Sequence, residues 1–165
     1  MTKKARLSLL AMGLLSAYLL SILSIQIVAP DKEIEPDDFP VMCLEDSLNC
    51  SMISPNHYRS GNLTELRINS SLEEVMNEVG SWIDSQPGTD VIGEWSGQTH
   101  AVFRTLMFRF PDDFVVRGFC DSGQTVLHVY SKSRLGISDL GVNKARVLSF
   151  ADYMSNVEIP TSECT

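Results

Sequence analysis

The spacing of hydrophobic and polar positions changes three times along the chain. Residues 7–29 form an unbroken run of 23 uncharged, mostly apolar side chains, LSLLAMGLLSAYLLSILSIQIVA. As a helix rising ~1.5 Å per residue, this run is about 34 Å long, enough to cross a bilayer core of ~30 Å. The pattern therefore predicts an N-terminal transmembrane helix within residues 1–29.

A cleaved signal peptide is the alternative for residues 1–29, because signal peptides also begin with basic residues and continue with apolar ones. Their apolar part usually has only ~7–15 residues before a cleavage site of small side chains. Here the run is longer, and its candidate cleavage site, Ile27-Val28-Ala29, is followed at once by Pro30. We favour an uncleaved signal-anchor over a signal peptide.

Helical spacing appears again after residue 70. Ser71 followed by Glu74 is a capping box, which marks the start of a helix. Pro87-Gly88 is typical of its end. Apolar residues recur between these signals at intervals of three and four, namely Leu72, Val75, Met76, Val79 and Ile83. The segment is predicted to be an amphipathic helix.

Four strand-like runs follow, separated by short turns rich in Gly, Pro, Asp and Ser. They are Thr89–Trp95, Thr99–Phe110, Phe114–Cys120 and Thr125–Arg134. Connections this short join only antiparallel neighbours, because a parallel crossover needs a dozen or more residues. A four-stranded antiparallel sheet is therefore expected.

Helical periodicity returns after Gly136, where Ser138 or Asp139 can cap a final helix. Its predicted buried stripe consists of Val147, Phe150, Ala151 and Met154. The order helix, four strands, helix predicts an α+β fold with both helices on one face of the sheet. An N-terminal transmembrane helix precedes this domain.

Charge separates the chain into regions. Three of the 13 basic residues precede the apolar run, whereas all 21 acidic residues follow it. By the positive-inside rule, the N-terminus stays in the cytoplasm and the body lies in the periplasm or otherwise outside.

Residues 30–42 are acidic and proline-containing, which predicts a spacer, and residues 43–165 form the exported domain. Such an acidic body should bind neither nucleic acid nor anionic headgroups.

Four cysteines lie beyond the apolar run, as expected of an exported domain with two disulfides. Four cysteines allow three connectivities. We predict Cys43–Cys50 as a local bridge and Cys120–Cys164 as a tie between the C-terminal tail and a strand. The spacings do not match the short paired spacings of zinc sites.

Charged and polar side chains interrupt the predicted core between His100 and Arg146. On the second strand, His100 and Arg104 share a face, and Asp112 and Asp113 follow in the next turn. The candidate site residues are Arg104, Asp112, Asp113, Arg134, Asp139, Asn143 and Arg146. The last three are spaced to share one face of a helix that begins at Asp139.

Two hypotheses account for this cluster. In the first, Asp112, Asp113 and Asp139 pair with the three arginines and lock the last helix onto the sheet, since guanidinium matches two carboxylate oxygens. In the second, Arg134 and Arg146 bind a small anion beside the N-terminus of that helix. The structural interpretation is favoured, because equal numbers of acids and bases satisfy one another.

Enzymatic alternatives find less support. The Gly-x-Ser-x-Gly turn of serine hydrolases is missing, as are Gly-rich phosphate loops and dinucleotide fingerprints. The remaining alternative is an envelope hydrolase that uses Asp112 or Asp113 with His100, with or without a divalent metal. Adjacent acids on a strand point in opposite directions, which disfavours a shared metal.

The most closely spaced set of charged, polar and glycine residues lies in the C-terminal half of the chain. It comprises an Arg-Phe-x-Asp-Asp element at Arg109, Phe110, Asp112 and Asp113, and a spaced set at Ser131, Ser133, Arg134, Gly136, Ser138, Asp139, Gly141, Asn143 and Arg146. With an upstream Asn49-Cys50 element, this pattern resembles the family known as domain of unknown function 1499 over about residues 43–155. The resemblance implies no reaction, substrate or cofactor.

Taken together, these features predict an uncharacterised membrane-anchored envelope protein with a non-catalytic binding or accessory role. Its expected partners are the membrane, through the N-terminal helix, and a small anionic ligand or another envelope protein. Neither a cofactor nor a metal is expected.

Overall fold

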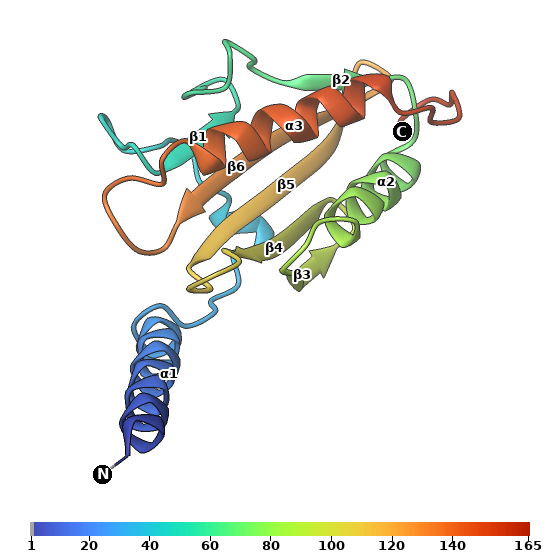
Figure 1. The fold of residues 1–165 in the computed structure, drawn as a ribbon. Coiled ribbons are helices and arrows are strands. Elements are labelled where there is room, and N and C mark those ends of the chain that lie inside the picture. Colours follow the sequence, from blue (N-terminus) through green and yellow to red (C-terminus); the bar gives the residue numbers. More distant parts are fainter. Residues whose placement is uncertain (1) are drawn as a thin grey trace.

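The computed structural model describes residues 2–165 and contains three α-helices and six strands (Figure 1). The helices are α1 (Lys3–Val28), α2 (Leu72–Asp84) and α3 (Val142–Asn156), with a 3-10 turn at Pro36–Asp38. The strands are β1 (Cys50–Ile53), β2 (Leu66–Ile68), β3 (Thr89–Trp95), β4 (Gln98–Arg104), β5 (Pro111–Asp121) and β6 (Gln124–Ser133). The α+β class is confirmed.

The six strands form one antiparallel sheet in the order β1-β6-β5-β4-β3, and β2 also pairs with β6. The prediction of four strands was therefore incomplete. Strands β1 and β2 lie in residues 41–69, where Pro55, Gly61 and many polar side chains leave only weak periodicity. Both are short, and every residue of β1 is buried, so the alternation that identifies a half-buried strand is missing there.

The strand predicted over residues 99–110 was too long. β4 ends at Arg104, and residues 105–110 form the turn that leads into β5. The Thr105 hydroxyl accepts a hydrogen bond from Phe110 N–H at 2.9 Å, and Arg109 has a positive φ of 56°. The apolar residues of this turn, Leu106, Met107, Phe108 and Phe110, resemble a continuation of the strand. Asp112 and Asp113 consequently lie within β5 and not in a turn.

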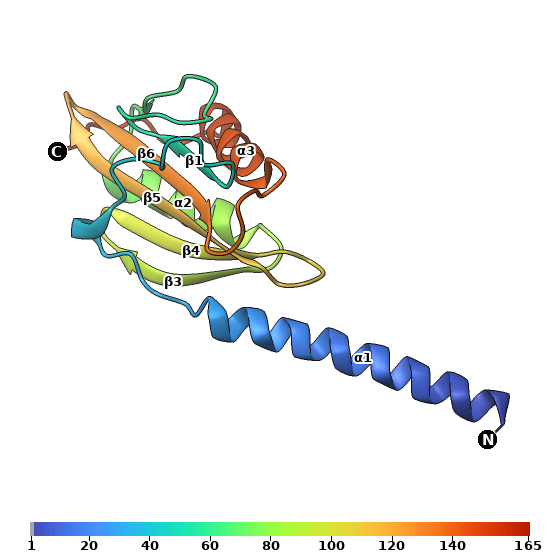
Figure 2. The ribbon, with the colours of Figure 1, turned by 90° about the vertical axis from the view of Figure 1, so that its left-hand side faces the viewer.

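Both domain helices cover the same face of the sheet, as predicted (Figure 2). Helix α2 packs on β4 and β5, and α3 packs on β1 and β6. Three aromatic rings meet between them: Trp82 lies 5.0 Å from Phe150 and 5.3 Å from Phe114, measured between ring centres. Buried aromatic groups of this kind supply much of the apolar area that stabilises a small domain.

The opposite face of the sheet is covered by the segment that follows α1. Ile34, Phe39 and Cys43 pack against Met52, Val115 and Tyr130 in a second, smaller core. The predicted Cys43–Cys50 disulfide is present and joins this segment to β1. Part of the predicted spacer therefore lies along the domain in this structure.

The C-terminal elements follow the prediction closely. Val147, Phe150, Ala151 and Met154 are the buried stripe of α3, although the helix begins at Val142 and not at Asp139. The predicted Cys120–Cys164 disulfide is also present and ties the tail to the end of β5.

Helix α1 projects away from the domain, and none of its residues is buried. Within residues 2–165 it is the one helix long and apolar enough to cross a membrane. Its length, composition and place near the N-terminus suit a membrane anchor and a signal peptide alike.

Candidate functional site

The two adjacent aspartates of β5 project to opposite faces of the sheet, because side chains alternate along a strand. Asp112 lies 2.9 Å from Arg146 of α3, whereas Asp113 lies 2.6 Å from Arg134, which follows β6. The single cluster expected around Arg134, Asp139 and Arg146 is therefore two networks, one on each face.

The helix-face network consists of Arg146, Asp112, Ser131 and Asn143. The Arg146 guanidinium donates to Asp112 Oδ2 at 2.9 Å, to Ser131 Oγ at 3.0 Å and to Asn143 Oδ1. Its Cζ atom lies 4.4 Å from the centre of the Phe103 ring. Burial lowers the pKa of Arg146 from its ordinary value, and Asp112 offsets part of this effect. The charge of Arg146 is thus compensated beneath α3.

Asn143 connects this network to the edge of the sheet. Its side-chain amide donates to the Asn49 carbonyl at 3.1 Å and to Ser133 Oγ at 3.0 Å, and its Oδ1 accepts from the Ser131 hydroxyl at 2.6 Å. The side chains of all four residues, Asn49, Ser131, Ser133 and Asn143, are buried. Asn143 therefore links α3, β6 and the residue that precedes β1.

Asp139 lies before α3 and caps it. Its two carboxylate oxygens accept from Gly141 N–H at 2.9 Å and from Asn143 N–H at 2.6 Å. A carboxylate at a helix N-terminus satisfies free N–H groups and complements the helix dipole. The prediction that Asp139, Asn143 and Arg146 share one helix face was thus wrong for Asp139.

The linker is the segment of about residues 30–43 that follows α1 and covers the other face of the sheet. The linker-face network consists of His100, Asp113, Arg134, Arg104 and Asp31. Asp113 accepts from His100 Nε2 at 2.8 Å and from Arg134 Nη2 at 2.6 Å. Burial opposes ionisation of Asp113, but the hydrogen bonds from His100 and Arg134 outweigh it and hold the pKa of the carboxyl below its usual value. Asp113 is therefore a charged partner at neutral pH.

Two arginines of this network hold the chain just after α1. Arg134 donates to Asp31 Oδ1 at 2.6 Å and to the Pro30 carbonyl at 2.8 Å. Arg104 donates to Asp31 Oδ2 at 2.6 Å and to Asp90 at 2.5 Å. Each oxygen of Asp31 thus binds a different guanidinium. Sequence reasoning paired Arg104 with the later aspartates and did not identify Asp31.

The residues of the hydrolase alternative either lie on opposite faces of the sheet or are buried from solvent. Asp112 lies on the other face from His100, and the His100 side chain has no exposed surface. His100 Nδ1 accepts from Ile34 N–H at 2.9 Å, while Nε2 faces Asp113. Both ring nitrogens are therefore engaged. Within residues 2–165, no group of three or more His, Cys, Asp or Glu side chains is arranged to hold a metal ion.

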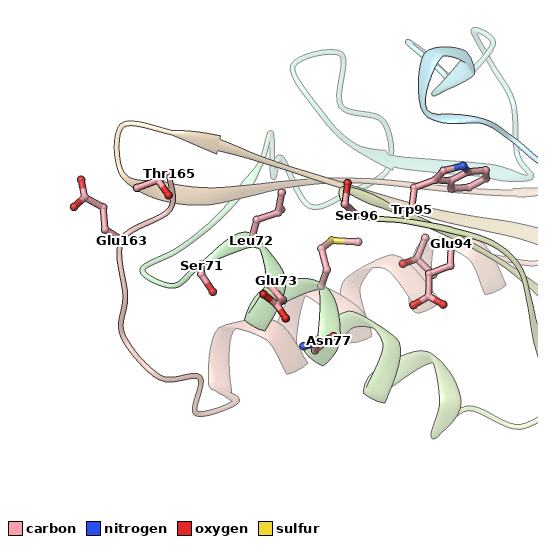
Figure 3. A pocket seen from close by; sticks show the side chains of 11 residues that line it. Ser71, Leu72, Glu73, Asn77, Glu94, Trp95, Ser96, Glu163 and Thr165 are labelled. Atoms are coloured by element: carbon pink, nitrogen blue, oxygen red, sulfur yellow. The ribbon is translucent and has the colours of Figure 1, made fainter.

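One cavity, of about 520 Å³, lies where α2 begins, and no residue of either network lines it (Figure 3). The start of α2, the β3–β4 turn and the C-terminal tail line it, with Leu72, Met76 and Trp95 beside Glu73, Glu94 and Glu163. Sequence reasoning singled out none of these as site residues. The cavity offers carboxylates and hydroxyls but no basic side chain.

A second cavity, of about 350 Å³, opens at the other end of the sheet. It lies between the β4–β5 turn and the loop before α3, and Phe110, Leu135, Leu140 and Val142 give it a mostly apolar lining. Asp112 also lines this cavity. This cavity adjoins the end of the domain from which α1 projects.

A family model described as a protein of unknown function, DUF1499, matches residues 35–154. The chain belongs to this family. The DUF1499 match spans β1 to β6, α2 and most of α3, and it includes the whole helix-face network. Pro30, Asp31 and Ile34 precede the matched residues, so the polar contacts to the linker segment extend beyond the DUF1499 region.

Other comparisons add little to the family assignment. No curated protein matches the DUF1499 chain significantly. Among solved structures, the chain is similar to TTHA0849 from Thermus thermophilus, with 10% sequence identity and a TM-score of 0.30. That similarity covers 66% of this chain and 89% of the other.

Proposed function

We propose that this protein is a single-pass membrane protein of the cell envelope, whose α+β domain lies outside the cytoplasm as a non-catalytic binding or accessory module. The observation that carries the proposal is the join between α1 and the domain. A long, unburied apolar helix leads directly into Pro30 and Asp31, which Arg134 and Arg104 bind through charged hydrogen bonds.

An uncleaved anchor fits these contacts better than a signal peptide. Cleavage after Ala29 would place a new charged amino terminus at Pro30, beside the buried Arg134 guanidinium. It would also remove Tyr18 and Gln26, whose side chains donate to backbone carbonyls of the β4–β5 turn. The two disulfides further support a location in an oxidising compartment.

A structural role for the charged residues is supported because each arginine already has a carboxylate partner. The side chains of Arg104, Arg134 and Arg146 are at most 10% exposed, and each guanidinium lies within 3 Å of a carboxylate oxygen. An anionic ligand would have to displace one of these carboxylates. Asp31, at 43% exposed, is the most accessible partner of Arg134.

Anion binding is testable at that position. In Asp31→Asn, both arginines lose a charged partner, so phosphate should raise the melting temperature of the variant more than that of the unmodified protein. Asp37→Asn, in the same segment, is the matched control. Equal responses of all three proteins to phosphate would remove the anion from the proposal and leave a purely structural network.

The membrane anchor is tested by fractionation of cells that make the full chain. We expect the protein to stay in membranes washed with alkaline carbonate, and external protease to digest the domain once any outer membrane or wall has been opened. Leu14→Arg combined with Leu15→Arg should release it, because charged side chains are costly at the bilayer centre. A mature protein that begins at Pro30 would contradict the anchor, and protection from external protease would contradict the orientation.

A further inference from the structure

The turn between β4 and β5, residues 105–110, exposes a cluster of large apolar side chains. Leu106 is 93% exposed and Met107 is 66% exposed, and Phe108 and Phe110 are also exposed. A soluble surface rarely gathers several such side chains in one short turn, and where it does, the patch usually contacts a membrane or a partner. The placement of this turn decides between these two.

The turn lies against α1 (Figures 1 and 2). The Tyr18 hydroxyl donates to the Met107 carbonyl at 2.6 Å, and the Tyr18 and Phe108 ring centres are 5.9 Å apart. Nearer the domain, Gln26 Nε2 donates to the Arg109 carbonyl at 3.0 Å. The turn therefore follows the last part of α1 back toward the N-terminus.

These contacts reach a level of α1 that a bilayer would cover. Arg6 is the last charged residue before the apolar run, and about 20 residues of helix are needed to cross the hydrocarbon core. Counted from Leu7, that span ends near Gln26. Tyr18 lies eight residues earlier, or ~12 Å deeper at ~1.5 Å per residue. The tip of the turn is thus beside the part of α1 that lies in the outer leaflet.

Backbone polar groups of the turn have hydrogen-bond partners within the protein, as an apolar environment requires. Irregular backbone is tolerated at membrane depth only where its polar groups find protein partners. Here Tyr18 and Gln26 satisfy the carbonyls of Met107 and Arg109. Inside the turn, Arg109 N–H donates to the Thr105 carbonyl at 3.0 Å, and Thr105 N–H donates to the Phe110 carbonyl at 3.1 Å. This explains why an apolar helix carries a glutamine and a tyrosine on this side.

The surroundings of the turn suit a position at the lipid boundary. Arg109 is exposed near the level of Gln26, where its guanidinium can reach phosphate groups while its stem stays among acyl chains. On the other side, the apolar cavity continues the surface from Phe110 to Leu140, which is 97% exposed. The apolar surface thus extends beyond the turn.

We infer that the β4–β5 turn is a second membrane contact, embedded in the outer leaflet beside α1, with Leu106, Met107 and Phe108 among the acyl chains. The inference rests on the proposed membrane anchor. It adds that the domain is held at a fixed depth and orientation by two adjacent contacts, and is not free to move on a tether.

Depth-dependent fluorescence quenching tests this inference with the full chain in phosphatidylcholine vesicles that contain doxyl-labelled lipids. Phe108→Trp reports on the turn, Leu14→Trp on the anchor, and Glu163→Trp on the far end of the domain. The native Trp82 and Trp95 provide the background, measured on the unmodified protein. We expect Phe108→Trp to be quenched and blue-shifted to an extent similar to Leu14→Trp, and Glu163→Trp to be unaffected.

The outcomes separate the two proposals. If Leu14→Trp is quenched while Phe108→Trp behaves like Glu163→Trp, the embedded turn is overturned and the anchor stands. If Leu14→Trp is not quenched either, both the anchor and the embedded turn fail. Quenching of Phe108→Trp that weakens in Tyr18→Phe would support the role of the Tyr18 hydroxyl in holding the turn.

Discussion

The two faces of the sheet use the same kind of chemistry for different purposes. On the helix face, Asp112 and Arg146 are sealed between α3 and the strands, and both side chains are at least 90% buried. On the linker face, Asp113 and Arg134 bind the segment that leaves α1, through Pro30 and the half-exposed Asp31. One ion pair belongs to the interior of the domain, and the other joins the domain to its N-terminal helix.

This difference teaches that neighbouring residues of one motif can have separate roles. Asp112 and Asp113 are adjacent in the chain, yet the alternation of the strand gives them different partners, different burial and different neighbours. Disruption of the first should weaken the whole domain. Disruption of the second should chiefly release the linker.

The largest effect is expected from Asp112→Asn, which leaves the Arg146 guanidinium buried without a counter-charge. Breaking a buried pair in this way typically costs about 3–5 kcal/mol of unfolding free energy. Denaturant unfolding in detergent measures the loss. Adding Arg146→Met should recover part of it, because the double variant buries no charge there.

The matched control for that experiment is Asp113→Asn, one residue away on the other face. It should lose less stability than Asp112→Asn, because Asp113 is more exposed and its partner Arg134 keeps Asp31. Equal losses would contradict the distinction between the two faces.

Arg134→Met should have the next largest effect, because Asp113 and the Pro30 carbonyl both lose a donor. Leaving a buried polar group unsatisfied costs about 1–3 kcal/mol. The more specific readout is tryptic cleavage after Lys32, which should become faster as the linker detaches. Lys132→Met, two residues earlier near the end of β6, is the charge-matched control. Unchanged cleavage at Lys32 would show that Arg134 does not hold the linker.

Loss of the Cys43–Cys50 disulfide should weaken the other end of the same linker. The bridge closes a short loop, since its cysteines are seven positions apart. The chain-entropy relation then gives about 2 kcal/mol. Cys43→Ser with Cys50→Ser should therefore increase exchange of the backbone amides around Phe39, measured by hydrogen–deuterium exchange, while amides of α3 keep their protection. A uniform loss of protection would argue against a separate linker unit.

The smallest effect is the acid sensitivity of Asp113. Its folded pKa lies below the unfolded value of about 3.9, so its ionised form stabilises the fold above that value. This contribution is lost as the pH falls through the folded pKa. The difference in unfolding free energy between the unmodified protein and Asp113→Asn should therefore shrink as the pH falls from 7 to 3.

Asp84→Asn, at the exposed end of α2, is the control for the pH series. Its difference from the unmodified protein should vary less with pH than that of Asp113→Asn. A difference for Asp113→Asn that stays constant over this range would contradict the lowered pKa.

Local patterns were sufficient for most of the fold. The capping box at Ser71 marks the start of α2, the side chain of Ser71 caps that helix, and both disulfides join the predicted cysteines. These features depend on neighbours in sequence or on a small number of alternatives. The short β1 and the turn at residues 105–110 escaped prediction, because their patterns contradict or imitate those of ordinary strands.

The sequence predicted most residues of the candidate site, but not which of them form ion pairs with one another. The sequence by itself determined the apolar helix, the acidic body, the alternation of the strands and the set of charged side chains that a core must neutralise. Only the tertiary structure decided that Asp31 binds two arginines more than 70 positions away, and that Asp112 and Asp113 serve different faces. Ion pairs form wherever the fold brings opposite charges together, and no local pattern records that distance.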